Sequence, residues 1–204
     1  MNVKGLYALT PDCVDTVDLL KRVKLALAGG VQVLQYRNKI ADAEMQLIQA
    51  QALRKLTRDS NVIFIINDDP KLAAKVDADG VHLGATDGEV AAARALLGDN
   101  KLIGVSCYNQ LQLALNAVAT GADYVAFGAF FSSSVKPNAA VATLTLLREA
   151  RAALAVPIVA IGGINAANGS ELVRAGADAF AVISAVFAAP DIKLATQQLS
   201  KLFR

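Results

Sequence analysis

The chain has 204 residues, of which 54% are hydrophobic and 19% are charged, and its formal net charge is +2. Such a composition is typical of one well-buried globular domain over residues 1–204 and excludes a disordered chain. The small net charge argues against a nucleic-acid partner and an acidic membrane surface, and the longest apolar run, 179–189, is far below the roughly 20 residues of a membrane helix.

Short apolar runs alternate with longer segments of helical period along the whole chain. The apolar runs predict strands at 5–9, 31–36, 62–67, 80–84, 101–105, 124–128, 157–161 and 179–183. The periodic segments predict helices at 14–28, 42–58, 70–77, 87–97, 109–120, 141–154, 167–175 and 191–203. The strand runs are continuously apolar, as expected when both faces of a parallel sheet are covered. This order predicts a single α/β domain, an eight-stranded parallel (β/α)8 TIM barrel; an open doubly wound sheet is the competing architecture.

A Gly-Ala-Asp pattern recurs between a helix and the next strand, at 121–123 and 176–178, with related turns at 28–31 and 77–80. We expect glycine to end the helix in the left-handed conformation and aspartate to bind turn amides. In a barrel these turns lie on the rim opposite the active site, so Asp79, Asp123 and Asp178 are predicted to serve stability.

Gln35, Arg37 and Lys39 stand two residues apart at the end of the second strand run. In extended chain this spacing places three nitrogen donors on one face, which suits phosphate oxygens. A solvated strand end is the alternative interpretation.

Two carboxylates, Asp68 after Asn67 and Asp87 after the fourth strand run, follow neighbouring strands. Two carboxylates together with phosphate oxygens are typical of a Mg²⁺ site. Each aspartate alone can instead cap the helix that follows it, Asp68 in front of Pro70.

Gly162-Gly163 and Ile183-Ser184 close the seventh and eighth strand runs. Loops at these two places form a recurrent phosphate site in barrels, because glycine leaves backbone amides accessible. The segment Ser132-Ser133-Ser134-Val135-Lys136 adds hydroxyl groups and a cation, which can grip phosphate and neutralise a leaving group. A structural turn and an ordinary surface loop are the alternatives.

His82 is the only histidine, and its strand neighbours Val81 and Leu83 favour a hydrogen-bonded core residue. Cys107 is interpreted as a small buried residue rather than a nucleophile. Cys13 and Cys107 form no metal-binding pattern, and the chain begins directly with a strand run. Free thiols without a targeting segment indicate a reducing compartment, the cytoplasm.

Over essentially its full length the chain resembles the thiamine-phosphate synthase family. The motifs that carry the resemblance are Gln35-Tyr-Arg-Asn-Lys39, Ile66-Asn-Asp68, Asp79-Gly-Val-His-Leu-Gly84 with Asp87, Gly104-Val-Ser-Cys107, Phe127-Gly128 through Lys136-Pro137, and Ala160-Ile-Gly-Gly-Ile164. The resemblance implies two substrates, hydroxymethylpyrimidine pyrophosphate and a thiazole phosphate, and Mg²⁺ as cofactor. A homodimer is open as the state of assembly, since the outer helices of a barrel can pair in many ways.

The resemblance also implies roles for residues of the matching motifs. It assigns Arg37, Lys39, Lys136 and Ser106 to catalysis and Asp68 and Asp87 to the metal. It assigns substrate binding to Gln35, Tyr36, Arg37, Asn38, Lys39, Asn67, Ser106, Ser133, Ser134, Val135, Lys136, Gly163, Ile183 and Ser184. The implied reaction proceeds through a pyrimidinyl cation and needs no protein nucleophile.

The chain departs from the family pattern at Ser132 and Val135, where Pro and Thr are usual, and at Ala85, where Gln is usual. Val135 offers no side-chain hydrogen bond, so weaker substrate binding is expected. Three alternatives stay open: a thiazole tautomerase, which has a histidine just after the fifth strand where this chain has Ser106-Cys107; a non-catalytic phosphate-ligand binder; and another phosphate-binding barrel enzyme such as an isomerase or aldolase.

Overall fold

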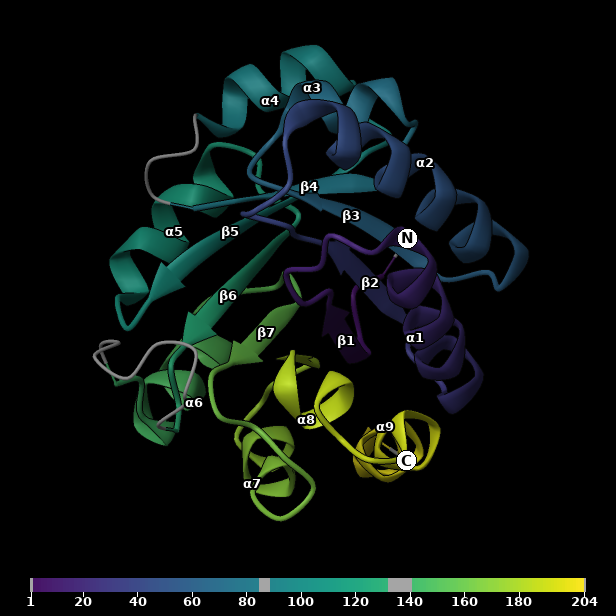
Figure 1. Cartoon of the computed structure of the whole chain (residues 1–204). Helices are drawn as coiled ribbons and strands as arrows, with labels where there is room; N and C mark the ends of the chain where they lie inside the picture. The colour runs from purple at the N-terminus through teal and green to yellow at the C-terminus, as the bar shows by residue number, and fades with distance from the viewer. Residues whose placement is uncertain (1, 85–88, 132–140, 204) are drawn as a thin grey trace.

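The structure is a computed structural model that describes residues 2–84, 89–131 and 141–203. Eight parallel strands pair in chain order, and β1 pairs with β8, so the sheet is a closed barrel. Helices surround the strands, and α9 lies beside α1 where the ring closes (Figure 1). The prediction of an eight-stranded TIM barrel is therefore confirmed, and the open doubly wound sheet is excluded.

The strands are short and regularly spaced along the chain. Their bounds are β1 Gly5–Leu9, β2 Val33–Tyr36, β3 Ile63–Asn67, β4 Gly80–Leu83, β5 Leu102–Tyr108, β6 Tyr124–Gly128, β7 Ile158–Ile161 and β8 Ala179–Val182. The helices are α1 Thr16–Gly29, α2 Ala43–Asp59, α3 Pro70–Lys75, α4 Val90–Leu97, α5 Leu111–Ala119, α6 Leu144–Ala153, α7 Gly169–Arg174, α8 Ser184–Phe187 and α9 Ile192–Ser200, followed by a 3₁₀ turn at Lys201–Phe203. The short helix α8 was not predicted, because its four residues are too few for a helical period.

Polar side chains fix several helix starts. The carboxylates of Asp15, Asp42 and Asp191 and the hydroxyl of Thr143 accept hydrogen bonds from first-turn amides. At α3 the capping residue is Asp69, which accepts from the amides of Lys71 and Leu72. Helix capping is thus not the role of Asp68, the alternative that the sequence left open.

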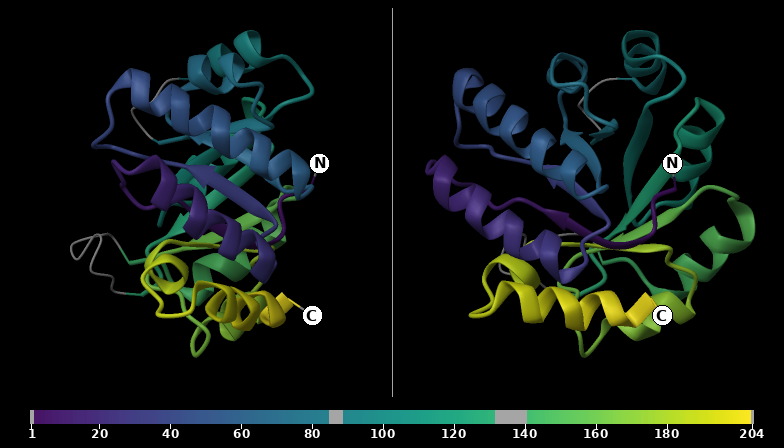
Figure 2. Two further views of the ribbon diagram at one scale, coloured as in Figure 1. Left: turned by 45° about the vertical axis from the view of Figure 1, so that its right-hand side comes forward. Right: turned by 90° about the vertical axis from the view of Figure 1, so that its right-hand side faces the viewer.

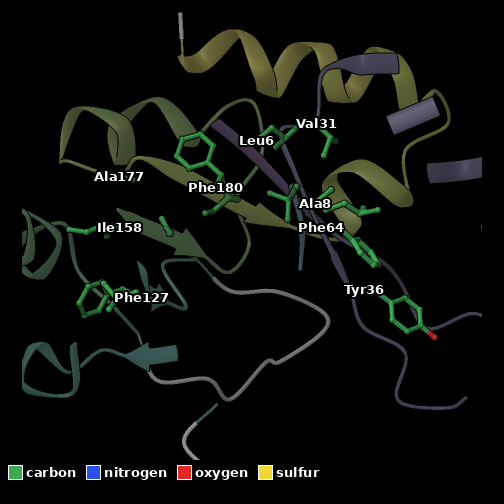
Figure 3. Close-up of a cluster of buried hydrophobic side chains, with 14 of the residues drawn as sticks. Leu6, Ala8, Val31, Tyr36, Phe64, Phe127, Ile158, Ala177 and Phe180 are labelled. Atoms are coloured by element: carbon green, nitrogen blue, oxygen red, sulfur yellow. The ribbon is translucent and has the colours of Figure 1, made fainter. Parts of the chain in front are cut away.

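Alternate residues of each strand face two separate cores. The outer core lies between strands and helices; Leu6, Phe64 and Phe180 belong to it (Figure 3). The inner core fills the barrel with Tyr7, Val33, Ile65, Tyr124 and Val159 among others. Side chains two residues apart on a strand therefore lie on the same face, and only one of the two alternating sets of each strand points into the barrel.

Three arginine–aspartate pairs hold the N-terminal rim, where both ends of the described chain also lie (Figure 2). They are Arg54–Asp79, Arg94–Asp123 and Arg151–Asp178, with N–O distances of 2.8, 2.5 and 2.8 Å. Each aspartate also accepts a hydrogen bond from a backbone amide at the start of the preceding strand, namely that of Phe64, Ile103 or Ile158. The recurring aspartates thus join neighbouring strands, rather than only binding their own turns as the pattern predicted.

The helix-ending position of these turns lies in the left-handed region, as predicted. Gly121 has φ 100° and Gly176 has φ 112°, while the turn before β4 has Asp77 there with φ 51°. Across the described residues, no helix combines the length and hydrophobicity that a membrane crossing requires.

Candidate active site

A cavity of about 380 Å³ opens at the carboxyl ends of the strands, the rim where active sites of this fold lie. Its walls combine small apolar side chains of the inner core with a few polar groups. Its lining residues are Tyr7, Leu9, Gln35, Arg37, Asn67, His82, Tyr108, Ala126, Gly128, Ala129, Val159, Ile161, Gly162, Gly163, Ile164, Ala181, Val182, Ile183, Ser184 and Ala185. A largely apolar pocket with a few convergent polar groups is the usual form of a small-molecule site.

The end of β2 brings Gln35 and Arg37 to this cavity, as their spacing predicts. Tyr36 and Asn38, which alternate with these residues, face α2 instead. The Tyr36 hydroxyl donates to Oε1 of Gln49 at 2.9 Å, and Nδ2 of Asn38 donates to the same oxygen at 3.0 Å. Neither side chain lines the cavity, and their predicted substrate contacts stay predictions. Lys39 is exposed on the same loop and does not line the cavity.

Residues of the β1–α1 loop hold Arg37 in place. Nη1 of Arg37 donates to Oδ1 of Asp12 at 3.2 Å, and the amide of Lys39 donates to the same oxygen at 2.8 Å. Thr10 hydrogen-bonds both the amide and the carbonyl of Arg37. The guanidinium group is thus oriented at the cavity edge while its side chain stays 18% exposed. Thr10 directly follows β1 and Asp12 lies two residues further on, but neither was predicted as a site residue, because their contacts with Arg37 depend on the pairing of β1 with β2.

Asn67 and Asp68 lie at the end of β3, next to β4. Asn67 lines the cavity, and the amide of Asp68 donates to the carbonyl of His82 at 2.8 Å. Asp68 has φ 63°, a conformation that aspartate and asparagine adopt more readily than most residues. The partly buried Asp68 carboxylate at this edge, not used as a helix cap, fits a Mg²⁺ ion, which commonly takes one or two carboxylates and keeps several waters. No cluster of three or more metal-binding side chains occurs within 2–84, 89–131 and 141–203.

The opposite side of the cavity is formed by the ends of β7 and β8. Gly162 and Gly163 have φ 103° and 62°, and a Cβ on Gly162 would lie 2.4 Å from the Cβ of Ala129. Only glycine fits this turn without strain. Ile183 and Ser184 line the same side, so the structure brings together the two loops that the sequence singled out for a phosphate.

Some predicted site residues lie outside the described part of the chain. These are Asp87, Ser133, Ser134, Val135 and Lys136, together with the departures Ala85 and Ser132. Their predicted roles stay predictions.

The polar side chains at the base of the cavity were not singled out by the sequence as site residues. Tyr7 and His82 line the cavity, and Tyr124 lies fully buried between them. Nδ1 of His82 is 3.1 Å from the Tyr124 hydroxyl, and its Nε2 is 2.9 Å from Oγ of Ser106. The expectation of a hydrogen-bonded histidine is confirmed, but its place in the cavity was missed. Ser106 is partly exposed and is hydrogen-bonded to His82, which lines the cavity.

Cys107 is buried in the outer core on the far side of β5, and burial raises the pKa of its thiol to about 12. A thiol with such a pKa is almost entirely protonated near neutral pH, so Cys107 is not a nucleophile for this cavity, as predicted.

The closed barrel and the largely apolar cavity at its carboxyl rim, with its few polar groups, define a (β/α)8-barrel protein with a candidate small-molecule site. The family model described as thiamine monophosphate synthase matches residues 6–186. The chain is 56% identical over 189 residues to the thiamine-phosphate synthase of Azoarcus sp. (strain BH72), covering 93% of this chain and 92% of that one. It is 53% identical over 201 residues to the thiamine-phosphate synthase of Methylobacillus flagellatus, covering 98% and 96%.

Among solved structures, the chain is similar to the thiamine phosphate pyrophosphorylase from Pyrococcus furiosus. The TM-score is 0.88 and the identity 37%, over 98% of this chain and 95% of that one. The chain belongs to the thiamine monophosphate synthase family, and it is therefore an enzyme of the transferase class.

Proposed function

We propose that this enzyme condenses hydroxymethylpyrimidine pyrophosphate with a thiazole phosphate, releasing pyrophosphate and forming thiamine phosphate. The observation that carries the proposal is the two-sided cavity. One side presents Arg37 and Asn67, and the other presents the Gly162-Gly163 turn with Ser184. A site with donors for charged oxygens on both sides suits two phosphorylated substrates whose reacting ends meet in the apolar middle.

The side formed by β2 and β3 is assigned to the pyrophosphate of the pyrimidine substrate. Arg37 offers a planar fork of N–H donors, and Asp12 already orients it. Asn67 adds an amide donor, and Lys39 adds a charge from the rim of the same loop. Lys136 is assigned here by its position in the sequence motif alone.

Asp68 and, by the sequence motif, Asp87 are the residues that would hold Mg²⁺. When bound, the ion would neutralise the charge that develops on the departing pyrophosphate. Arg37 contributes in the same sense, because a cation aimed at developing charge stabilises the transition state more than the ground state.

The glycine turn and Ser184 are assigned to the phosphate of the thiazole. Gly163 leaves backbone N–H groups open to an anion, and the Ser184 hydroxyl is a further donor. Ser133, Ser134 and Val135 are assigned to the same phosphate by motif. Anchoring the thiazole at this side points its ring nitrogen towards the middle of the cavity.

In the proposed reaction, the methylene C–O bond breaks and its electron pair leaves with the pyrophosphate oxygen. The amino-substituted pyrimidine ring stabilises the resulting cation. The lone pair of the thiazole nitrogen then forms the new C–N bond. No protein atom bonds to the substrate, which agrees with a protonated Cys107 on the far side of the strand.

The proposal is tested by mixing purified enzyme with both substrates and measuring pyrophosphate and thiamine phosphate, with Mg²⁺ and with EDTA. Stoichiometric, Mg²⁺-dependent formation of the two products is expected. Tight binding of both substrates without either product would instead support a non-catalytic binder. Isomerisation of a thiazole substrate alone would support a tautomerase.

A further inference from the structure

Five side chains from five different strands form one continuous hydrogen-bond chain across the barrel interior. Nε2 of Gln35 donates to the Tyr7 hydroxyl at 2.8 Å, and the hydroxyls of Tyr7 and Tyr124 are 2.9 Å apart. The Tyr124 hydroxyl lies 3.1 Å from Nδ1 of His82, whose Nε2 lies 2.9 Å from Oγ of Ser106. The two ends of the chain, Gln35 and Ser106, are residues that the sequence motifs assign to the pyrimidine substrate.

The Gln35 N–H can only donate to Tyr7, whereas either of the two tyrosine hydroxyls can donate to the other. Donation from Tyr124 to Tyr7 would leave the buried Tyr7 proton without an acceptor among the described side chains, which favours a Tyr7 proton directed at the Tyr124 oxygen and a Tyr124 proton directed at His82. Nδ1 of His82 is then the acceptor, so the neutral imidazole carries its proton on Nε2. That N–H donates to Ser106, whose own hydroxyl proton is left for an acceptor outside the chain.

The surroundings keep the middle of the chain protonated and fixed. Tyr7 and Tyr124 are 1% and 0% exposed, and burial raises the pKa of both phenols well above the ordinary value of 10.0. The rings of His82 and Tyr124 are stacked at 5.6 Å between centroids. Gly104 makes room for this arrangement, since a Cβ there would lie 2.0 Å from Cζ of Tyr124. A packed hydrogen-bond network with a buried middle of this kind holds its members in one geometry.

We propose that Tyr7, Tyr124 and His82 are positioning residues that set the direction of this chain, so that Ser106 donates and the carbonyl oxygen of Gln35 accepts in the site. The proposal rests on the proposed function, because it takes the pyrimidine as the ring that these two ends meet. A ring carrying both an unprotonated nitrogen and an amino group complements one donor and one acceptor. Reversal of the chain would exchange donor for acceptor at both ends, and such a ring would then meet two unmatched groups.

The direction can be measured without turnover, because His82 is the only histidine of the protein. In protein labelled with ¹⁵N-histidine, the two imidazole nitrogens give one pair of NMR signals. The proposal predicts a protonated Nε2 and an unprotonated, hydrogen-bonded Nδ1. A protonated Nδ1 would show the opposite direction and overturn the proposal, whatever reaction the enzyme catalyses.

Substitution then tests the link to binding. In Tyr124→Phe, Nδ1 of His82 loses its donor, so its signal should shift to that of an unbonded nitrogen. The KM for the pyrimidine substrate should rise about three- to ten-fold, the range of one hydrogen bond, with a smaller change in kcat. Tyr36→Phe removes another buried tyrosine hydroxyl, bonded to Gln49 on the opposite face of β2, and should leave the histidine signals unchanged.

His82→Gln and His82→Leu separate donation from packing. Glutamine keeps an N–H donor for Ser106, so His82→Gln should retain a lower pyrimidine KM than His82→Leu at similar thermal stability. Equal KM values in both variants, or an unchanged KM in Tyr124→Phe, would overturn the positioning role. A wild-type enzyme with no turnover would overturn the proposed function, while the NMR result would still decide the direction of the chain.

Discussion

The two rims of the barrel use charged side chains in different ways. At the N-terminal rim, Asp79 accepts two hydrogen bonds from Arg54 and one from the amide of Phe64, and the side chains of the pair are only 11% and 17% exposed. At the C-terminal rim, the one carboxylate that pairs with Arg37 among the described residues is Asp12, which is itself 36% exposed. Charges at the first rim are paired within the fold, although Nε of Arg54 is buried without a hydrogen-bond partner among the described residues. The Arg37 guanidinium at the second rim lies at the cavity edge, where a ligand can reach it.

The two ends of the strands are therefore expected to contribute to different properties, the N-terminal rim to stability and the C-terminal rim to activity. The N-terminal pairs tie neighbouring strands together and lie at the opposite end of the barrel from the cavity. The C-terminal groups surround a cavity whose walls carry few charges. Substitutions at one rim are therefore expected to change the free energy of unfolding, and those at the other to change the kinetics.

The largest expected effect is on activity, from Arg37→Ala. Loss of a cation aimed at the departing pyrophosphate should lower kcat/KM about 10²- to 10³-fold, with little change in the urea midpoint. Steady-state kinetics and urea unfolding on the same preparation measure both. Arg148→Ala, which removes an exposed arginine from α6, should leave both unchanged. A loss of activity below three-fold would remove Arg37 from the pyrophosphate site.

Asp79→Ala should have the converse effect. It leaves the Arg54 guanidinium and the Phe64 amide unpaired in a nearly buried place, and breaking such a pair costs about 3 kcal/mol in free energy of unfolding. KM values should stay within two-fold. Asp178→Ala, in a pair that is 33% and 38% exposed, should cost less in the same urea titration. Equal losses in the two variants would mean that burial does not set the strength of these pairs.

Gly104→Ala should affect stability and site together, because this residue lies between the rims. The added methyl group meets the ring of Tyr124, and overpacking of this kind costs about 1–3 kcal/mol. The cost should shrink when Tyr124 is also shortened to valine, in a double-mutant cycle of unfolding free energies. Additive costs would show that the clash is relieved elsewhere.

The smallest effect is expected at Asp77, an exposed neighbour of the N-terminal pairs. Hydrogen bonding to Lys101 lowers the pKa of Asp77 below its ordinary value of 3.8. A lowered pKa in the folded state adds stability that is present above about pH 4 and is lost as pH falls through the folded-state pKa. Because the carboxylate is 60% exposed, Asp77→Asn should cost less than about 1 kcal/mol at pH 7, and the cost should be smaller at pH 2. A constant cost across thermal melts at these two pH values would contradict the charge-based explanation.

Much of this architecture can be predicted from the sequence because strand periodicity is local. Continuous apolar runs predicted every strand, and the two-residue spacing correctly put Gln35 and Arg37 on one face. The same alternation places Tyr36 and Asn38 on the opposite face, where both are hydrogen-bonded to Gln49. A prediction that assigns every residue of the motif to the site does not take this alternation into account.

Partners across the barrel could not be predicted. Tyr7 and Tyr124 are far apart in the sequence. The period of two relates only residues of the same strand, and in a continuously apolar run it does not show which face is inward. Barrel closure decides that the two tyrosines meet. Similarly, both Asp68 and Asp69 precede Pro70, and only the backbone conformation makes Asp69 the cap and leaves Asp68 at the rim.

The central claim is that one cavity binds the two charged groups on opposite sides. A crystal structure with pyrophosphate, thiamine phosphate and Mg²⁺ tests it most directly. We expect pyrophosphate beside Arg37 and Asn67, and the phosphate of thiamine phosphate on the Gly162-Gly163 turn beside Ser184. Both phosphate groups on one side of the cavity, or either product bound outside it, would contradict the account.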